Sequence, residues 1–572
     1  MINEKENQLS KIFLESWRPF FWIALAILFV YSVALSFNIV YLDDNVLVTD
    51  QYQFNKSLSN IPQAFNEDIF RTPHNGGTFY RPILRLTFMF DAQFGEKAIV
   101  FMSHFSNILL HILSICLLFY FLLKLNLKKE IAFLFALFFS IHPLTAQTVA
   151  FISGRNDSLL AIPIFLSLIF FLNFLQNQKN KHLVWHLVFF ALALFTKETA
   201  VVLPIICAIY LLIFIGWEKI IENYKMYLRL GFYWVGIVSF WFLIRMSVLH
   251  NFVGNADYNV FLSIYKNLPS LISAIGKIFL PFNLSVFPVM SDMTLLYGII
   301  SIILLGFWFF LSEKRNLKLI IFGFLWFFIF IFLTLIKPIN TVPEFSENRI
   351  YLPMFGFIFV IIGLGRIKLP IIIKEKINYE INWKKIILFF SLLIILIFSS
   401  VTIYRNKYYR NRFNFWENAT KTSPSFAFNH NNLGAMYYLD KDMENAEKEF
   451  KIALELNPNE KMAHNNLGLI YANQNKFKEA EEEYKKEIEN NPYYDSVYYN
   501  LGLLYYKQKK YTEAEYNWKK TLELNPNYFD AIKALIVYYY EQKNYKEMSI
   551  YARELQNRGF LLPDEFQKVI EP

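Results

Sequence analysis

The chain contains few of the residues that hold small secreted or metal-binding domains together. Its 572 residues include only two cysteines, and Cys116 and Cys207 each lie inside an apolar run. A disulfide framework or a thiolate metal site is therefore not expected. No spacing of histidines, cysteines and carboxylates resembles a metal site closely, so no cofactor is predicted, although the sequence leaves a divalent metal ion open.

Charge is scarce as well. Charged residues make up 18% of the chain, against 55% hydrophobic and 19% aromatic residues, and the mean hydropathy is +0.30. This balance excludes an ordinary soluble enzyme of this size. The formal net charge of +9 does not indicate a nucleic-acid partner, because the basic residues form short clusters between apolar runs instead of one stripe.

Long apolar runs fill the sequence before about residue 404. Since a bilayer needs roughly 20 apolar residues per helix, we predict an all-α bundle of about eleven spans. The runs are 19–40, 99–123, 131–151, 158–176, 184–196, 199–216, 230–249, 293–312, 319–336, 351–366 and 386–403. Prolines interrupt 260–290, which is expected to be interfacial or re-entrant. The first run ends without a small-residue cleavage site, which favours a signal anchor.

Basic residues predict the orientation of these spans. The clusters fall in every second loop: Lys5/Lys11/Arg18, Lys124/Lys128/Lys129, Lys179/Lys181, Lys219/Lys225/Arg229, Lys314/Arg315/Lys318 and Arg366/Lys368/Lys374/Lys376/Lys384/Lys385. Short loops rich in Lys and Arg stay in the cytoplasm. An odd number of spans that starts inside therefore places the C-terminal region outside the cytoplasm, whereas ten or twelve spans would reverse it.

The C-terminal third repeats itself every 34 residues. Asn-Leu-Gly recurs at 432–434, 466–468 and 500–502, and tyrosine, alanine and proline keep the same period: Tyr437, Tyr471, Tyr505 and Tyr539; Ala446, Ala480 and Ala514; Pro424, Pro458, Pro492 and Pro526. Small residues let two helices cross closely, and proline ends each unit. The fourth unit has Ile536 and Met548 at the glycine and alanine positions, which suits a capping unit.

This period resembles the tetratricopeptide repeat (TPR) over about residues 424–556. We therefore predict a membrane domain at 1–404, a linker at 405–423 and a TPR α-solenoid at 424–572. The solenoid is expected to bind an acceptor or partner protein, and the alternative is that it only spaces or dimerises the chain.

Polar residues gather at one end of the predicted spans. They are Asp43, Asp44, Tyr80, Arg81, His142, Arg155, Asp157, Lys197, Glu198, Glu347 and Arg349. An unpaired charge costs about 2.5–3.5 kcal/mol at a helix centre, and a transporter should place such groups near the midplane. Their position at the outer ends favours an outward-facing reaction chamber.

Several groups of polar residues suggest roles. Asp43 and Asp44 could supply a general base and a second acid that orients it, or they are a solvated helix end. Arg155, Lys197 and Arg349 could form a pocket for a lipid phosphate, or they snorkel. His104, Asn107 and His111 share one helix face, which is typical of helix packing but allows an active-site role. His142 precedes Pro143, which leaves its imidazole at the interface.

These segments together resemble the GT-C superfamily of membrane glycosyltransferases, and more narrowly the transmembrane and TPR-containing O-mannosyltransferases and their bacterial relatives. The matching segments are Tyr-Leu-Asp-Asp-Asn (41–45), Tyr-Arg-Pro-Ile (80–83), His-Phe-Ser-Asn-Ile-Leu-Leu-His (104–111), His-Pro-Leu-Thr-Ala-Gln (142–147), Ile-Ser-Gly-Arg-Asn-Asp (152–157), Thr-Lys-Glu (196–198) and Glu-Asn-Arg-Ile-Tyr-Leu-Pro (347–353). One departure is Gln147, where the family pattern has Glu.

The resemblance implies a sugar, with mannose as first candidate, on a dolichyl or polyprenyl phosphate. It implies inverting transfer to a hydroxyl, such as a protein Ser or Thr, on the non-cytoplasmic face of a bacterial cytoplasmic membrane. Asp43 matches the catalytic base, with Asp44 beside it. The other matching positions imply substrate binding by Tyr80, Arg81, His104, His142, Arg155, Asp157, Lys197, Glu198, Glu347 and Arg349.

Two other functions compete with this one. An O-antigen ligase or oligosaccharyltransferase-like enzyme would need a large outer loop late in the membrane domain, whereas the longest predicted outer loop is the early one at about 41–98. A non-catalytic scaffold anchored in the membrane would need only one or two spans.

Overall fold

The computed structural model describes residues 12–71, 79–249, 259–336, 346–365, 383–558, 561–563 and 566–567. These residues form helices of several kinds and no strand. The chain divides into two compact units, Met1–Ser423 and Pro424–Pro572. The predicted all-α fold is thereby confirmed.

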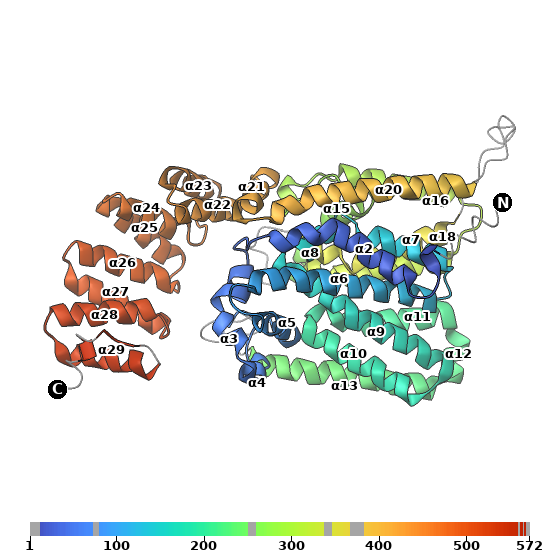
Figure 1. Cartoon of the computed structure of the whole chain (residues 1–572), viewed down its shortest axis with the longest axis horizontal. Coiled ribbons are helices and arrows are strands. Elements are labelled where there is room, and N and C mark those ends of the chain that lie inside the picture. The colour runs from blue at the N-terminus through green and yellow to red at the C-terminus, as the bar shows by residue number, and fades with distance from the viewer. Residues whose placement is uncertain are drawn as a thin grey trace. The chain divides into compact units, whose positions relative to one another are not determined.

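The first unit is a bundle of long helices joined by short ones (Figure 1). Its α-helices are α2 (Arg18–Tyr31), α3 (Tyr52–Lys56), α4 (Ile61–Ala64), α5 (Pro82–Ala92), α6 (Ile99–Lys124), α7 (Lys129–Ser140), α8 (Thr145–Ala150), α9 (Arg155–Asn177), α10 (Asn180–Thr196), α11 (Leu203–Tyr210), α12 (Trp217–Glu222), α13 (Tyr224–Val248), α14 (Val260–Asn267), α15 (Pro269–Phe279), α16 (Leu296–Leu311), α17 (Leu317–Phe332), α18 (Gly356–Leu364), α20 (Trp383–Asn406) and α21 (Arg412–Thr422).

Short 3-10 and π turns extend or join these helices. They are η1 (Ser32–Ser36), η2 (Asn45–Asp50), η3 (Leu58–Asn60), η5 (Ile152–Gly154), η6 (Glu198–Val202), η7 (Leu211–Ile215), η8 (Met290–Asp292), η9 (Leu333–Leu335), η10 (Glu347–Ile350), η11 (Pro353–Phe355) and η12 (Lys407–Tyr409). Several of the polar residues singled out above lie in or beside these turns, where the main chain changes direction.

The core of this unit surrounds α9. Helix α9 packs between α6 and α10, and α6 packs in turn against α2 and α7 (Figure 1). In the span that contains α9, 72% of the apolar window is buried inside the protein, whereas only 11% of the α13 window is buried. Helix α9 is therefore enclosed by protein, and α13 presents most of its apolar surface outward.

The predicted count of eleven spans is not confirmed. Among the described residues, eight helices are long and apolar enough to cross a membrane. Three predicted runs are missing from these eight. The run 131–151 is broken between α7 and α8 at His142 and Pro143, while α10 has 17 residues and α16 has 16. Of the basic residues that set the orientation, Lys5, Lys11 and the stretch from Arg366 to Lys376 lie outside the described residues.

The segment predicted as a linker, 405–423, is helical for most of its length. It comprises the end of α20, η12 and α21. Tyr409, Phe415 and Trp416 in this segment are fully buried, and the Trp416 indole donates a hydrogen bond of 2.9 Å to the carbonyl of Val40. The aromatic side chains therefore fix this segment within the first unit.

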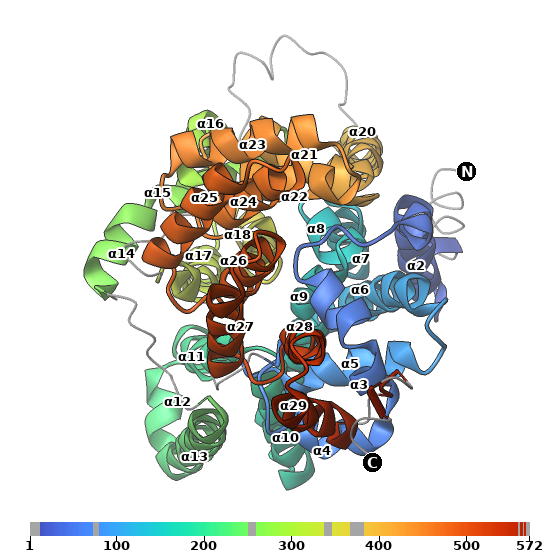
Figure 2. The same cartoon turned by 90° about the vertical axis from the view of Figure 1, so that its left-hand side faces the viewer.

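The second unit consists of four antiparallel helix pairs, which stack side by side from α22 to α29 (Figure 2). The helices are α22 (Ala427–Leu439), α23 (Met443–Leu456), α24 (Ala463–Asn473), α25 (Phe477–Asn490), α26 (Asp495–Lys507), α27 (Tyr511–Leu524), α28 (Phe529–Glu541) and α29 (Tyr545–Asn557). The predicted TPR fold is confirmed.

The repeated glycine has a packing role. A Cβ atom added to Gly468 would come within 2.6 Å of the Tyr484 ring, and one added to Gly502 would come equally close to the Trp518 ring. Each first helix therefore lies directly against an aromatic ring of the second helix, which leaves no room for a side chain.

The last repeat reverses this arrangement. Ile536 stands at the glycine position, and Ala552 stands where the earlier repeats have an aromatic ring. Both side chains are buried in the core of the unit. A larger residue on the first helix is thus matched by a smaller one on the second, which conserves the packed volume.

Candidate active site

The two adjacent carboxylates after the first span have different environments. Asp44 is 1% exposed. Its carboxylate accepts hydrogen bonds from the backbone N–H groups of Val40 (2.7 Å), Leu42 (3.1 Å) and Asn45 (3.0 Å). Burial raises the pKa of the Asp44 carboxyl to about 7, although the three donors lower it. Asp44 therefore holds the turn together from inside the protein.

Asp43 is exposed on the same turn. Its φ angle is +65°, and that of Tyr41 is +62°. A left-handed conformation in a residue other than glycine costs about 1–3 kcal/mol and persists only where neighbouring contacts impose it. Here the hydrogen bonds of Asp44 and the indole of Trp416 impose it. The turn thus presents the Asp43 carboxylate at the protein surface in a fixed position.

A half-buried ion pair joins the long first loop to the junction of α10 and η6. Arg81 donates to Glu198 through Nε (3.0 Å) and through a terminal nitrogen (2.5 Å). The side chains of Arg81 and Glu198 are 12% and 29% exposed. A bidentate pair of this kind fixes the plane of the guanidinium group. Both groups remain accessible from outside the protein.

A second polar chain continues from the neighbouring lysine. Lys197 donates to Asp157 (2.6 Å) and to the side-chain oxygen of Asn156 (3.2 Å). The other oxygen of Asp157 accepts a hydrogen bond of 2.9 Å from the Asn348 side chain. Three segments distant in the sequence meet at this point, namely the starts of α9, η6 and η10.

The electrostatics connect these groups to Asp43. Burial alone would lower the pKa of the Arg81 guanidinium. The carboxylate of Glu198, with smaller contributions from Asp157 and Asp43, has a stronger effect in the other direction, so that the pKa of Arg81 is raised. Burial lowers the pKa of Lys197, and Asp157 opposes this effect only in part. The candidate active site therefore combines one exposed carboxylate, Asp43, with the partly exposed Arg81 and, behind it, the buried Lys197, which is 7% exposed.

Arg155 does not belong to this cluster. Its side chain is fully buried, and its guanidinium donates to Asp91 (2.7 Å), Asn107 (2.7 Å) and the carbonyl of Ser103 (2.7 Å). The predicted phosphate contact of Arg155 is thus not supported, because all of its donor directions point into the protein.

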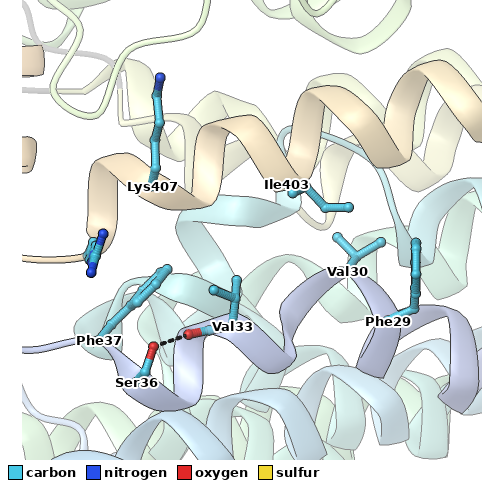
Figure 3. A pocket seen from close by; sticks show the side chains of 8 residues that line it. Phe29, Val30, Val33, Ser36, Phe37, Ile403 and Lys407 are labelled. Atoms are coloured by element: carbon cyan, nitrogen blue, oxygen red, sulfur yellow. Dashed lines mark hydrogen bonds between the residues drawn. The ribbon is translucent and has the colours of Figure 1, made fainter.

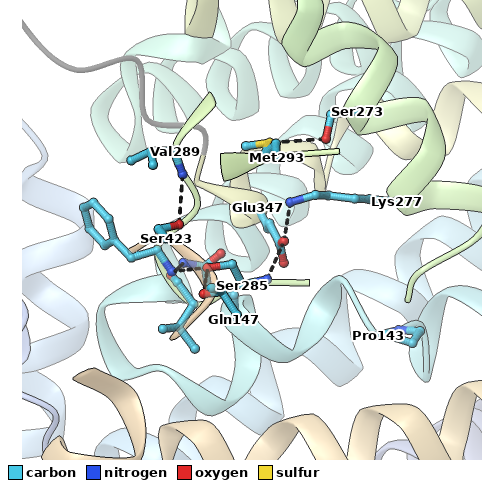
Figure 4. A network of polar contacts seen from close by, with 12 residues as sticks. Pro143, Gln147, Ser273, Lys277, Ser285, Val289, Met293, Glu347 and Ser423 are labelled. Carbon is cyan, nitrogen blue, oxygen red and sulfur yellow. Dashed lines mark hydrogen bonds and ion pairs between the residues drawn. The ribbon is translucent and has the colours of Figure 1, made fainter. Parts of the chain in front are cut away.

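Glu347 is likewise enclosed. Its carboxylate accepts from Lys277 (2.5 Å), from Arg405, and from the backbone N–H of Ser285 (3.0 Å). Figure 4 shows Lys277 and Ser285 converging on it from two sides. This network ties η10 to α15 and α20, so it positions helices instead of meeting substrate.

Three other predicted site residues are also buried. His142 accepts from the N–H of Leu144 and is 2.9 Å from the carbonyl of Ile278, so it stabilises the break between α7 and α8. The Tyr80 hydroxyl donates to the carbonyl of Phe65. His104 is 1% exposed and lies edge-on to the Phe37 ring. The geometry therefore supports a packing role for each of them.

Gln147, the departure from the family pattern, has a structural explanation. Its side-chain oxygen accepts from the N–H of Asn348 (3.0 Å), and its nitrogen donates to the carbonyl of Val286 (3.1 Å). An ionised carboxylate could accept the first bond but could not donate the second. The amide thus bridges η10 and the segment after α15.

The structure adds a group of basic residues that sequence reasoning missed. Lys407, Arg410 and Arg412 follow the last span directly. The N–H of Asn38 donates to the carbonyl of Arg410 (2.9 Å), and the Arg412 guanidinium lies 5.6 Å from the centre of the Tyr41 ring. In the predicted topology these residues would be cations on the side that the positive-inside rule leaves poor in Lys and Arg, and this exception could have drawn attention to them.

No group of three histidine, cysteine or carboxylate side chains within the described part of the chain is arranged to hold a metal ion.

The fold and this site define a helical integral membrane protein that carries a TPR array. Residues 87–243 match the family model described as dolichyl-phosphate-mannose-protein mannosyltransferase, and residues 430–495 and 496–528 match two tetratricopeptide-repeat models. These matches confirm the resemblance to TPR-containing O-mannosyltransferases of the GT-C type and indicate a glycosyltransferase family.

No curated protein matches the sequence. Among solved structures, the crystal structure of MamA is 20% identical, with 28% of this chain and 85% of that chain covered and a TM-score of 0.23. MamA from Desulfovibrio magneticus RS-1 is 16% identical (28% and 86% covered, TM-score 0.23), and Pseudomonas aeruginosa pilF is 19% identical (31% and 78% covered, TM-score 0.25).

Proposed function

We propose that the first unit transfers a sugar from a polyprenyl-phosphate carrier to a hydroxyl group, with a protein Ser or Thr as acceptor and mannose as first candidate sugar. The reaction takes place on the non-cytoplasmic face of a bacterial cytoplasmic membrane. The observation that carries this proposal is the exposed carboxylate of Asp43 on a strained turn, together with the contribution of its charge to the raised pKa of Arg81. The mannosyltransferase match supports it.

Asp43 is the general base in this mechanism. Its carboxylate takes the proton of the acceptor hydroxyl while the hydroxyl oxygen forms a bond to the anomeric carbon. The bond between that carbon and the phosphate oxygen breaks, and polyprenyl phosphate leaves with the electron pair. Because the oxygen attacks opposite the leaving phosphate, the configuration inverts. Asp44 positions the base through its three hydrogen bonds to the turn.

Arg81 and Lys197 stabilise the charge that develops on the leaving phosphate. Fixed cations are effective there because they need no rearrangement during the reaction. Glu198 and Asp157 hold them in place. Half-buried Arg349 is a further candidate for phosphate contact. Arg155 has no part in this proposal, because it is enclosed.

The TPR unit recruits the acceptor protein. Deletion of residues 424–572 should preserve transfer to a small hydroxyl acceptor and abolish transfer to protein acceptors. An unchanged acceptor range in the truncated chain would show that the array is only a spacer.

The test of the function itself is a donor panel. The purified chain is incubated with polyprenyl-phosphate monosaccharides and a mixed protein acceptor, and the released polyprenyl phosphate is measured. Release with one donor would establish the reaction class and name the sugar. No release with any donor would contradict the proposal and favour a diphosphate-linked oligosaccharide donor or a scaffold.

A further inference from the structure

A groove runs between the first and last spans. It has a volume of about 420 Å³ and lies between α2 with η1 on one side and α20 with η12 on the other (Figure 3). Five of its eight lining residues are apolar, namely Phe29, Val30, Val33, Phe37 and Ile403. Phe29 is 70% exposed and Val33 is 47% exposed. Since both flanking helices are candidate membrane spans, this exposed apolar wall suits an isoprenoid chain.

One end of the groove is basic. Arg410 lines it and is exposed, and no described residue forms an ion pair with it. The Lys407 stem also lines the groove, but its ammonium group lies 3.4 Å from the centre of the Tyr404 ring and points away from Val33 (Figure 3). Arg410 is therefore the cation that the groove itself offers to an anion.

The basic end adjoins the proposed active site. The N–H of Asn38 donates to the carbonyl of Arg410. Two residues further on, Val40 donates its N–H to Asp44 and accepts from Trp416. The end of the groove and the turn that carries Asp43 are thus parts of one hydrogen-bonded assembly.

We infer that this groove is the place where the lipid carrier enters from the bilayer, with its isoprenoid chain along α2 and α20 and its phosphate on Arg410. This inference rests on the proposed function. Three observations favour the carrier over bulk phospholipid as occupant. The groove has an apolar wall, it has a cation at one end only, and that end is joined to the turn bearing the proposed base. An entry site of this kind contributes to donor binding and leaves the chemical step to Asp43, Arg81 and Lys197.

Two variants test the entry site. Arg410→Gln removes the cation, and Val33→Trp fills the groove. Arg410→Gln should raise the KM for the lipid-linked sugar about tenfold, in line with the loss of a charge-assisted contact. Val33→Trp should also raise this KM, because the indole ring takes the space of the isoprenoid chain. Both variants should leave kcat unchanged. Each should also reduce labelling of α2 and α20 by a photoactivatable polyprenyl phosphate, measured without sugar or acceptor.

Matched controls carry the same changes elsewhere. Lys128→Gln removes an exposed cation just before α7, and Val235→Trp adds a ring to the exposed face of α13. Both controls should retain the wild-type KM and labelling. A lower kcat with unchanged KM in Arg410→Gln would overturn the entry role. Competition by phosphatidylglycerol vesicles equal to that by polyprenyl phosphate would overturn the assignment to the carrier.

The two proposals fail in different ways. Normal transfer with unchanged KM and labelling in both groove variants would overturn the entry site and leave the proposed function intact. Specific labelling of the groove in a wild-type protein that releases no polyprenyl phosphate from any sugar donor would leave a carrier site and contradict the transferase.

Discussion

Two ion pairs, one from each unit of the molecule, are held in opposite ways. In the first unit, Arg155 and Asp91 lie 2.7 Å apart and both are fully buried. In the second unit, Lys451 and Glu447 lie equally close, but their side chains are 50% and 21% exposed. A buried charge without a partner is strongly destabilising, whereas an exposed pair contributes little.

This difference changes how polar residues in the membrane unit are interpreted. Most of the charged residues at helix ends in the membrane unit, including Arg155 and Glu347, are enclosed and paired with residues of opposite charge. A polar residue among apolar spans is therefore not by itself a sign of catalysis. Asp43 is distinguished by its exposure and by its strained backbone.

Removal of one partner of the buried pair should have the largest effect on stability. Arg155→Met leaves Asp91 buried without its cation, which should cost about 3–5 kcal/mol. The measurement is thermal unfolding in detergent. The double variant Arg155→Met/Asp91→Asn should recover part of the loss, since no buried charge remains. Equal stability of the single variant and the wild type would contradict the account of Arg155 as a structural residue.

A smaller loss is expected when the repeat packing is changed. Gly468→Ile places a side chain against the Tyr484 ring and should cost about 1–3 kcal/mol by overpacking. Adding Tyr484→Ala to this variant should restore the protection of the repeat helices from hydrogen exchange. Residues 468 and 484 would then have the same side chains as Ile536 and Ala552 of the last repeat. Hydrogen exchange of the repeat helices measures this. If the second substitution does not increase this protection, the proposal that a larger side chain at one position is matched by a smaller one at the other is refuted.

A pH effect on stability is expected in the second unit. Burial alone would lower the pKa of His464. The 2.5 Å contact of His464 with Glu483 and its hydrogen bond to the Pro458 carbonyl outweigh the effect of burial, so that the pKa is raised. The resulting stabilisation is complete below the pKa of the unfolded histidine, near pH 6.5, and is lost as pH rises through the raised folded value.

The protection of α24 and α25 from hydrogen exchange should therefore decrease as the pH rises above about 6.5. The variant Glu483→Gln should reduce this dependence. An identical pH profile in the variant would rule out the pair as its source.

The smallest effect should come from an exposed pair. Lys451→Gln should change the stability of the repeat unit by less than about 0.5 kcal/mol. A loss comparable to that of Arg155→Met would remove the contrast between the two units.

The repeat unit was largely predictable from the sequence, because each repeat uses the same residues at the same spacing. The matching of Ile536 with Ala552 was not, since it depends on which residues face each other. In the first unit, hydropathy located most spans, and Pro143 already indicated the break that the structure shows between α7 and α8.

The site was predictable only in part. Asp43 and Asp44 are adjacent, and no sequence pattern tells which of them faces outward; the turn decides this. Arg155 and Asp91 are 64 residues apart in the chain, so only the packing of helices shows that they neutralise each other. Pairing across helices is a property of the fold, and one sequence does not contain it explicitly.

The most direct test of the account compares Asp43→Asn with Asp44→Asn. Release of polyprenyl phosphate and thermal unfolding are measured for both variants and the wild type. The account predicts that Asp43→Asn unfolds at the wild-type temperature and loses transfer about 100- to 10,000-fold, while Asp44→Asn loses stability as well as activity. Normal transfer by Asp43→Asn would contradict the assignment of Asp43 as the base.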